Sequence, residues 1–289
     1  VRGGLSGFNP QNLSSTAWAY ATAGVRADAL YAAIAETAVR GGLGGFNPQD
    51  LSNTAWAYAT AGVSRPQLFK ELVLAITLSM SSSPSCWSAD ALRALHLWQL
   101  QLSLQGDVSE SQLLSSDLRQ RCRDAMRFAD VHPSKLQRSV AVALAELHPG
   151  FEEEVVDEQT GYTLDLALRS SLLAVEVDGP SHFIHNPGTQ GEQLPTGSTI
   201  LKRRLLRMAG WCVLSVPFYE WDPLTNPQAQ CQYLRRCLDG KLSQNTRDSD
   251  SAPTTPTQPS RTHLLVAPGA PQRPRAHASA ASPRAPRCL

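Results

Sequence analysis

The stretch "AVEVDGPSHF", residues 174–183, combines the pattern of a buried strand with residues that a buried strand seldom carries. Because side chains alternate along a strand, we expect Glu176 and Asp178 to share one face and the intervening valine to point to the other. The Gly-Pro pair that follows predicts a turn leading to His182. Carboxylates inside a sheet need a cation, a proton or a basic partner. The stretch therefore predicts a strand that carries a polar site near its end.

The segments on both sides of this stretch predict an α/β region. In order, they favour a helix with an apolar stripe, three strands, a capped helix, a buried strand and a final helix. The expected ranges are 134–147, 153–157, 162–168, 172–178, 198–210, 211–221 and 227–238. This order is typical of an α/β sandwich with a mixed sheet.

The helix expected over residues 198–210 carries one lysine within its apolar face. With successive residues placed at about 100° steps around the helix, Lys202 falls inside the apolar arc. We therefore expect Lys202 to face the sheet, near Glu176 or Asp178. Three arginines fall outside the arc and form a strip that either grips an RNA backbone or is simply a solvated helix face: Arg203, Arg204 and Arg207.

A repeat of 38 residues occupies the beginning of the chain, since residues 1–25 return at 39–63 with three differences. Each copy offers an Asn-Pro pair as a helix start and a glycine as a helix stop. A period of this length with one helical pair per unit predicts an α-solenoid of helix-turn-helix repeats. Residues 89–106 have the pattern of a degenerate third unit or a cap.

Two of the three positions that differ between the copies lie three residues apart and share a helix face. If each repeat reads one base of RNA, we expect the contacts to come from Asn12 and Ser15 in the first copy and from Asp50 and Asn53 in the second. The alternative is that an acid or amide in the first turn only suits the helix cap and dipole.

Composition limits the classes of protein that remain. A net charge of +1 excludes a uniformly basic protein, so any surface for nucleic acid is local. The six cysteines are scattered without paired spacing, which indicates neither a zinc site nor a disulfide framework. No apolar run is long enough to cross a bilayer, so no membrane contact is expected. Val1 stands inside a repeat copy, and we expect further repeats and a targeting peptide upstream.

The end of the chain, residues 241–289, is rich in Pro, Ser and Arg and poor in large apolar residues, which predicts a disordered tail. The predicted organisation is thus α + α/β. Helical repeats occupy residues 1–130, with the period clear to about residue 80, and an endonuclease-like α/β region occupies 134–240.

The repeat core "NPQDLSNTAWAYATAG", residues 47–62, resembles the octotricopeptide repeat, a helix-turn-helix unit of organellar RNA-binding proteins. It is also similar to the helical region of the FAST kinase-domain family. The resemblance covers roughly the first 80 residues and implies RNA recognition by the repeats.

Three segments in order, "LLAVEVDGPSHF", "PTGSTILKRRLLRMAGWCVLSVPFYEW" and "QCQYLRRCL", resemble the RAP domain over about residues 172–238. This resemblance implies an organellar RNA-binding protein of the mitochondrion or chloroplast. Such a protein would act in the processing, stability or maturation of mRNA or rRNA. Its implied partner is single-stranded RNA, together with other RNA-processing proteins.

The RAP domain is in turn similar to restriction-endonuclease-like folds, whose carboxylates hold a divalent cation that activates water. The similarity implies a candidate catalytic set of Asp165, Glu176, Asp178 and Lys202, with Mg or Mn held by the three carboxylates and His182 near the phosphate. In the usual pattern the lysine stands where this chain has Asp178, so Lys202 would be a migrated replacement. A metal-dependent endoribonuclease and a helical-repeat protein scaffold are therefore alternatives to a non-catalytic RNA-binding protein, which needs no cofactor.

Overall fold

The computed structural model describes residues 5, 7–106, 108–127, 133–184 and 193–250 of the chain. The tail predicted over 241–289 lies outside the described residues from 251 onward. Its first ten residues instead continue the last helix, α10 (Pro227–Asp250), so the prediction of disorder was wrong for them. No proline stands between Pro227 and Pro253 to stop the helix.

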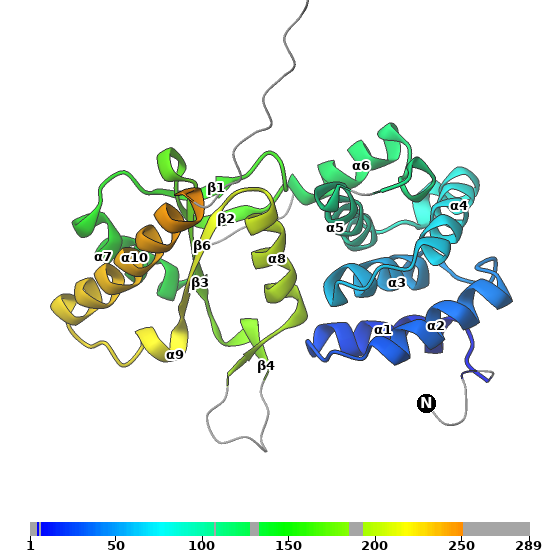
Figure 1. Ribbon diagram of the computed structural model, residues 1–289, viewed down its shortest axis with the longest axis horizontal. Coiled ribbons are helices and arrows are strands. Elements are labelled where there is room, and N and C mark those ends of the chain that lie inside the picture. Colours follow the sequence, from blue (N-terminus) through cyan, green and yellow to red (C-terminus); the bar gives the residue numbers. More distant parts are fainter. Residues whose placement is uncertain (1–4, 6, 107, 128–132, 185–192, 251–289) are drawn as a thin grey trace, which may run out of the picture. The chain divides into compact units, whose positions relative to one another are not determined.

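The described residues of the N-terminal region form six α-helices and two short 3₁₀ turns. Figure 1 shows the six α-helices grouped together. Each copy of the repeat forms two helices; α1 packs beside α3, and α3 packs beside α5. The bounds are α1 Pro10–Thr22, α2 Asp28–Gly41, α3 Pro48–Ala61, α4 Pro66–Ser82, η1 Pro84–Cys86, α5 Ala89–Gln105, η2 Glu110–Gln112 and α6 Ser116–Arg127.

Tyrosine hydroxyls make two buried hydrogen bonds in the repeats, one within the first copy and one between the two copies. The hydroxyl of Tyr31 donates to the carbonyl of Ala17 at 3.0 Å, and the hydroxyl of Tyr58 donates to the carbonyl of Tyr31 at 2.6 Å. Tyr58 also packs edge-on against Phe69, whose ring meets Trp98 in α5. The buried polar tips are thus satisfied while their rings fill one continuous core.

The C-terminal region is built on a four-stranded sheet of order β1-β2-β3-β6. Strands β3 and β6 are parallel and the other pairs are antiparallel, which confirms the predicted mixed sheet. A separate short pair is formed by β4 and β5. The bounds are α7 Lys135–Leu147, β1 Glu152–Val156, β2 Thr163–Leu168, η3 Arg169–Ser171, β3 Leu173–Asp178, η4 Pro180–His182, β4 Phe183–Ile184, β5 Leu194–Pro195, α8 Gly197–Met208, β6 Cys212–Pro217 and α9 Phe218–Trp221.

Helices cover both faces of this sheet (Figure 1). Helices α7 and α10 pack on one face against Val175, Val177 and Leu214. Helix α8 packs on the other face, where Leu206 meets Ala174 of β3. Alternation along β3 therefore directs Glu176 and Asp178 toward α8.

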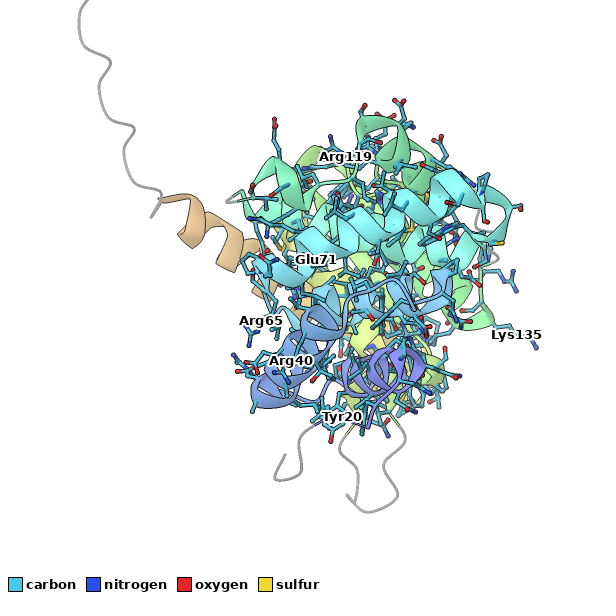
Figure 2. All side chains as sticks on the ribbon, turned by 90° about the vertical axis from the view of Figure 1, so that its right-hand side faces the viewer. Tyr20, Arg40, Arg65, Glu71, Arg119 and Lys135 are labelled. Carbon is cyan, nitrogen blue, oxygen red and sulfur yellow. The ribbon has the colours of Figure 1, made fainter. Side chains whose placement is uncertain are left out.

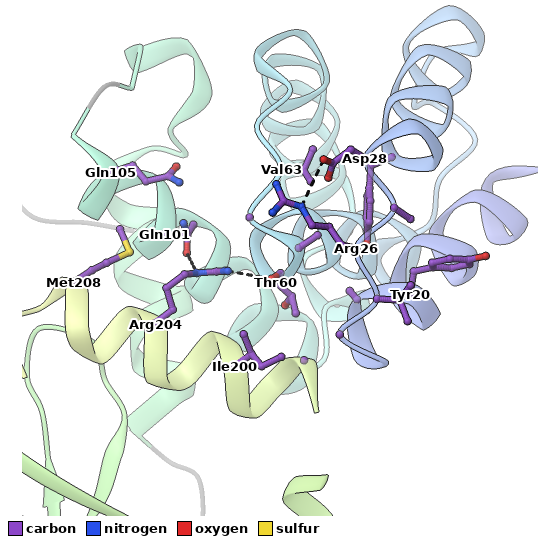
Figure 3. A pocket seen from close by; sticks show the side chains of 18 residues that line it. Tyr20, Arg26, Asp28, Thr60, Val63, Gln101, Gln105, Ile200, Arg204 and Met208 are labelled. Atoms are coloured by element: carbon purple, nitrogen blue, oxygen red, sulfur yellow. Dashed lines mark hydrogen bonds and ion pairs between the residues drawn. The ribbon is translucent and has the colours of Figure 1, made fainter. Parts of the chain in front are cut away.

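Helix α8 also contacts the N-terminal region through its outer face, where it lies against α1, α3 and α5. The guanidinium of Arg204 donates to the carbonyls of Ala59 and Thr60 at the end of α3 and to Oε1 of Gln101 in α5 (Figure 3). A helix end carries unpaired carbonyls and partial negative charge, so Arg204 caps α3 from outside. A pocket of about 420 Å³ borders this contact.

His96 makes a second contact between the N-terminal helical region and the C-terminal region. Its Nε2 lies 2.7 Å from the carbonyl oxygen of Thr160 in the loop between β1 and β2, and the side chain is buried in α5. Burial lowers the pKa of His96 below its ordinary 6.5, although the hydrogen bond to Thr160 opposes the shift. The neutral ring, donating from Nε2, is thus the native form.

This shift predicts that acid weakens the fold. Below pH 6.5 the native state binds fewer protons at His96 than the unfolded state, so the free energy of unfolding rises with pH up to that value. We expect His96→Gln, whose amide can still donate to Thr160, to show a smaller rise in urea unfolding measured across this range. His148→Gln, at an exposed position, is the control and should follow the unaltered chain. Equal pH slopes for all three proteins would contradict the assignment.

Two expectations from composition concern membranes and thiols. None of the described helices combines the length and apolar character needed to cross a membrane. The five cysteines within the described residues are free thiols, as their spacing predicts.

Candidate nucleic-acid interface

The carboxylates of β3 are buried and paired with cations from α8. Glu176 is 3% exposed and forms an ion pair with Lys202, which also donates to the carbonyl of Thr163 at 2.9 Å. Asp178 is 1% exposed and forms an ion pair with Arg203. The structure thus brings Lys202 to the sheet as its place on the helix predicts.

The prediction that Arg203 lies outside this face was wrong. Acids two positions apart on a strand are separated by about 6.6 Å, so two consecutive long side chains of the overlying helix can each reach one of them. Arg203 uses this reach to contact Asp178 and the hydroxyl of Ser215 at 2.7 Å. It is consequently half-buried and takes part in the sheet's charge network.

Asp178 is the most fully satisfied acid of the site. Nδ1 of His182 lies 3.0 Å from its Oδ1, while Arg203 and the hydroxyl of Ser215 donate to its Oδ2. Burial alone would raise the pKa of Asp178. The hydrogen bonds from His182 and Ser215 and the charge of Arg203 outweigh burial and hold that pKa below its usual value. Asp178 therefore stays ionised at neutral pH.

Glu176 sits in a less balanced environment. Burial raises its pKa to about 7, although Lys202 opposes the shift. Burial would lower the pKa of Lys202, but Glu176 and Asp165 hold it above its ordinary value. Oε1 of Glu176 is buried without a hydrogen-bond partner among the described residues. The pair thus keeps a charged lysine beside a carboxyl group that is readily protonated.

Asp165 stabilises the sheet through a hydrogen bond with the sheet's own backbone. Its Oδ2 accepts a hydrogen bond from the backbone amide of Val177 at 2.6 Å, just beyond the last β2–β3 pair, Leu166 with Val175. Burial raises the pKa of Asp165, while Lys202 and the amide of Val177 oppose the shift. The carboxylate thereby replaces a missing backbone partner where the two strands separate.

The three carboxylates do not fit a ready-made site for Mg or Mn. Asp165 is engaged by a backbone amide, Glu176 by Lys202, and Asp178 by three donors. Within the described residues, no group of three or more His, Cys, Asp or Glu side chains converges as metal ligands. A divalent cation would have to displace these donors before it could bind.

The base-contact positions predicted in the repeats divide into two groups. Asn12 and Asp50 complete reciprocal capping boxes with Asn9 and Asn47 at the starts of α1 and α3. Asp50 is also 5% exposed and accepts a hydrogen bond from the hydroxyl of Ser14 at 2.8 Å. Its prediction as a base contact was therefore wrong, and the alternative role in the helix cap applies.

The other three positions remain accessible. Asn12 and Ser15 are exposed on α1, and Asn53 is half-buried on α3, where it lines a groove. Of the predicted arginine strip, Arg207 is exposed at the last turn of α8. Arg204 was wrongly predicted as an RNA contact, because its donors are used by the carbonyls that end α3.

A pocket of about 440 Å³ opens over the paired acids. Its lining includes Glu176 and Asp178 from β3, His182 from the following turn, and Lys202 and Arg203 from α8; helices α5 and α6 contribute Arg93, Leu97 and Met126. The contribution of α5 and α6 to this pocket was not predicted from the sequence. Arg93 forms an i,i+3 ion pair with Asp90, which in the sequence looks like any exposed helix pair, so only the tertiary structure places it here.

Comparison with known proteins identifies the C-terminal region. Residues 175–237 match the RAP domain family, in agreement with the predicted range 172–238, and they contain most of β3, the following turn, α8 and β6. These residues therefore form a RAP domain. A particular relative is the "RAP domain-containing protein, chloroplastic" of Oryza sativa subsp. japonica, 37% identical over 140 residues. The alignment covers 48% of this chain and 20% of that protein.

Proposed function

We propose that this chain binds single-stranded RNA in the chloroplast and acts in the processing, stability or maturation of organellar transcripts. In this proposal the helical region is an octotricopeptide-like α-solenoid that selects the RNA, and the RAP domain engages the RNA backbone. The family match supports RNA binding by the RAP domain, and the name of the rice relative favours the chloroplast over the mitochondrion.

One observation carries the proposal. The pocket over β3 contains three groups able to donate to phosphate, on Arg93, His182 and Arg203, and its two acids are already paired with cations. An incoming phosphate therefore meets donors without facing two free carboxylates. Because helices α5 and α6 form the opposite wall, RNA in this pocket touches the helical region and the RAP domain together.

Metal-dependent cleavage of RNA is the second candidate function. The observation in its favour is the unpartnered, buried Oε1 of Glu176, which belongs to a residue that lines the same pocket. Oε2 of Glu176, Oδ2 of Asp165 and both oxygens of Asp178 already have partners. Binding without cleavage therefore accounts for more of the contacts than catalysis does.

Titration with labelled oligoribonucleotides tests the proposal. We expect fluorescence anisotropy to show binding whose logarithmic affinity falls linearly with the logarithm of salt concentration, with a slope of about −0.7 for each phosphate neutralised. His182→Gln should weaken binding several-fold. Arg169→Gln removes a cation from an exposed pair with Glu152 and is the matched control.

The same samples distinguish the two candidates. Incubation with Mg²⁺ or Mn²⁺ followed by gel analysis should leave the RNA intact. Cleavage that disappears in Glu176→Gln would establish the nuclease instead. Absence of RNA binding even at low salt would overturn both functions and leave a protein scaffold.

A further inference from the structure

The first helices of the two repeat copies carry tryptophans at the same position, Trp18 in α1 and Trp56 in α3. Their ring centroids lie 6.4 Å apart with planes tilted by 37°. Trp18 is 44% exposed, in contrast to Trp98 of the same helical region, which is completely buried. Trp56 is half-buried. Exposing a ring as large as that of Trp18 forgoes the free energy of burying it, so the exposed face of Trp18 is a candidate surface for a ligand.

A polar side chain stands one helical turn before each tryptophan. Ser15 precedes Trp18 and Asn53 precedes Trp56, and residues three apart share a helix face. Trp18, Asn53 and Trp56 line a single groove of about 460 Å³. An aromatic face beside a hydroxyl or amide is the combination that holds an unstacked base, since the ring stacks and the polar group contacts the base edge.

This groove adjoins the pocket over β3. Arg93 and Leu97 of α5 line both the tryptophan groove and the pocket over β3. Arg93 stands between them with a guanidinium of five N–H donors. Two hydrogen bonds hold it, from Nε to the carbonyl of Ala125 at 2.9 Å and from Nη1 to Asp90 at 2.6 Å. Among the described residues its Nη2 group has no hydrogen-bond acceptor, which leaves that group to donate to a phosphate beside the two cavities.

We propose that Trp18 and Trp56 form a base-stacking platform for single-stranded RNA, and that the same strand passes Arg93 and enters the RAP pocket at His182. This inference rests on the proposed RNA binding and adds the path that the RNA strand follows across the protein. The repeats hold the bases and the pocket holds the backbone of one continuous strand. The platform favours RNA over a protein segment because it lies beside a cavity whose donors suit phosphate.

Two readouts test the platform. Trp18→Leu should weaken binding of oligouridylate about tenfold to a hundredfold, the range expected when one stacking partner of a base is removed. It should also abolish part of the quenching of tryptophan emission that RNA causes. Trp18→Phe keeps an aromatic face and should retain most of the affinity. Circular dichroism and thermal melting establish that each variant is folded.

Tyr20→Leu is the matched control. Tyr20 is another exposed aromatic residue of α1, 39% exposed, but it lines the separate pocket beside α8 (Figures 2 and 3). RNA affinity should be unchanged in this variant. The path of the strand is tested with oligonucleotides of different lengths. His182→Gln should weaken the binding of long oligonucleotides and leave unchanged the binding of those too short to extend beyond the groove of Trp18 and Trp56.

The outcomes separate this inference from the function on which it rests. If the unaltered chain binds no RNA, the proposed function fails and the platform with it. If it binds RNA but Trp18→Leu binds as well as Tyr20→Leu, the platform alone is overturned. If His182→Gln weakens short and long oligonucleotides equally, the single continuous route is overturned.

Discussion

Asp178→Asn is expected to lower the free energy of unfolding by about 3–5 kcal/mol, because it removes one charge of a buried ion pair and leaves the other uncompensated. The carboxylate is 2% exposed at its side chain and Arg203 is 17% exposed, so water can replace little of what is lost. Asparagine keeps the shape of the side chain, and the loss therefore reports charge and hydrogen bonding. Urea unfolding at neutral pH measures the effect.

A surface pair within the same RAP-containing region provides the comparison. Arg169 and Glu152 lie 3.3 Å apart, and both side chains are more than half exposed. Glu152→Gln should therefore cost about 0–1 kcal/mol. The double variant Asp178→Asn with Arg203→Gln should recover part of the single variant's loss, because it removes the stranded charge. Similar losses of unfolding free energy for Asp178→Asn and Glu152→Gln would show that the buried ion pair contributes no more to stability than the exposed pair.

Local periodicity was sufficient to predict one half of the candidate site. The alternation of β3 and the 100° steps of α8 placed Glu176, Asp178 and Lys202 on facing surfaces without any knowledge of the tertiary structure. The prediction for Arg203 failed because the apolar arc gives only the direction in which a side chain leaves the helix, and not the position of its charged end. A long side chain can extend from the edge of that arc to a buried acid.

Contacts between distant segments could not be predicted from periodicity. Arg204 meets carbonyls almost 150 positions earlier in the chain, and Arg93 reaches the RAP pocket only because α5 packs beside α8. Asp50 shows a different limit, since a capping acid and a base-reading acid have the same sequence pattern. Its burial, which depends on Ser14 of the preceding repeat copy, decides between them.

Helix α8 makes contacts on two opposite faces, one toward the sheet and one toward the helical region. Its inner face supplies Lys202 and Arg203 to the acids of β3, while its outer face supplies Arg204 to the end of α3. The position of the pocket's cations is therefore set by contacts on both sides of the helix. A change on the outer face should be felt in the pocket, which makes the contact of α8 with α1 and α3 the most informative place to alter.

Gly197→Ala is expected to lower the free energy of unfolding by about 1–3 kcal/mol, although alanine favours helices intrinsically. Gly197 is the first residue of α8, and an added Cβ would overlap the backbone carbonyl of Ala21 and approach Cγ2 of Thr60 to 2.9 Å. Backbone atoms cannot rotate away as a flexible side chain can, so α8 must shift from the ends of α1 and α3. Thermal and urea unfolding measure the loss.

Gly240→Ala in α10 makes the same chemical change where nothing lies within 4 Å of the added Cβ, and it should be neutral or stabilise by up to about 1 kcal/mol. Opposite signs for the two variants isolate the steric contact from helix propensity, which alone would favour alanine at both sites. Since α8 carries Lys202 and Arg203, Gly197→Ala should also weaken RNA binding where Gly240→Ala does not. Stabilisation by both substitutions would mean that α8 does not pack closely against α1 in solution, and the shared wall of the pocket would then be lost.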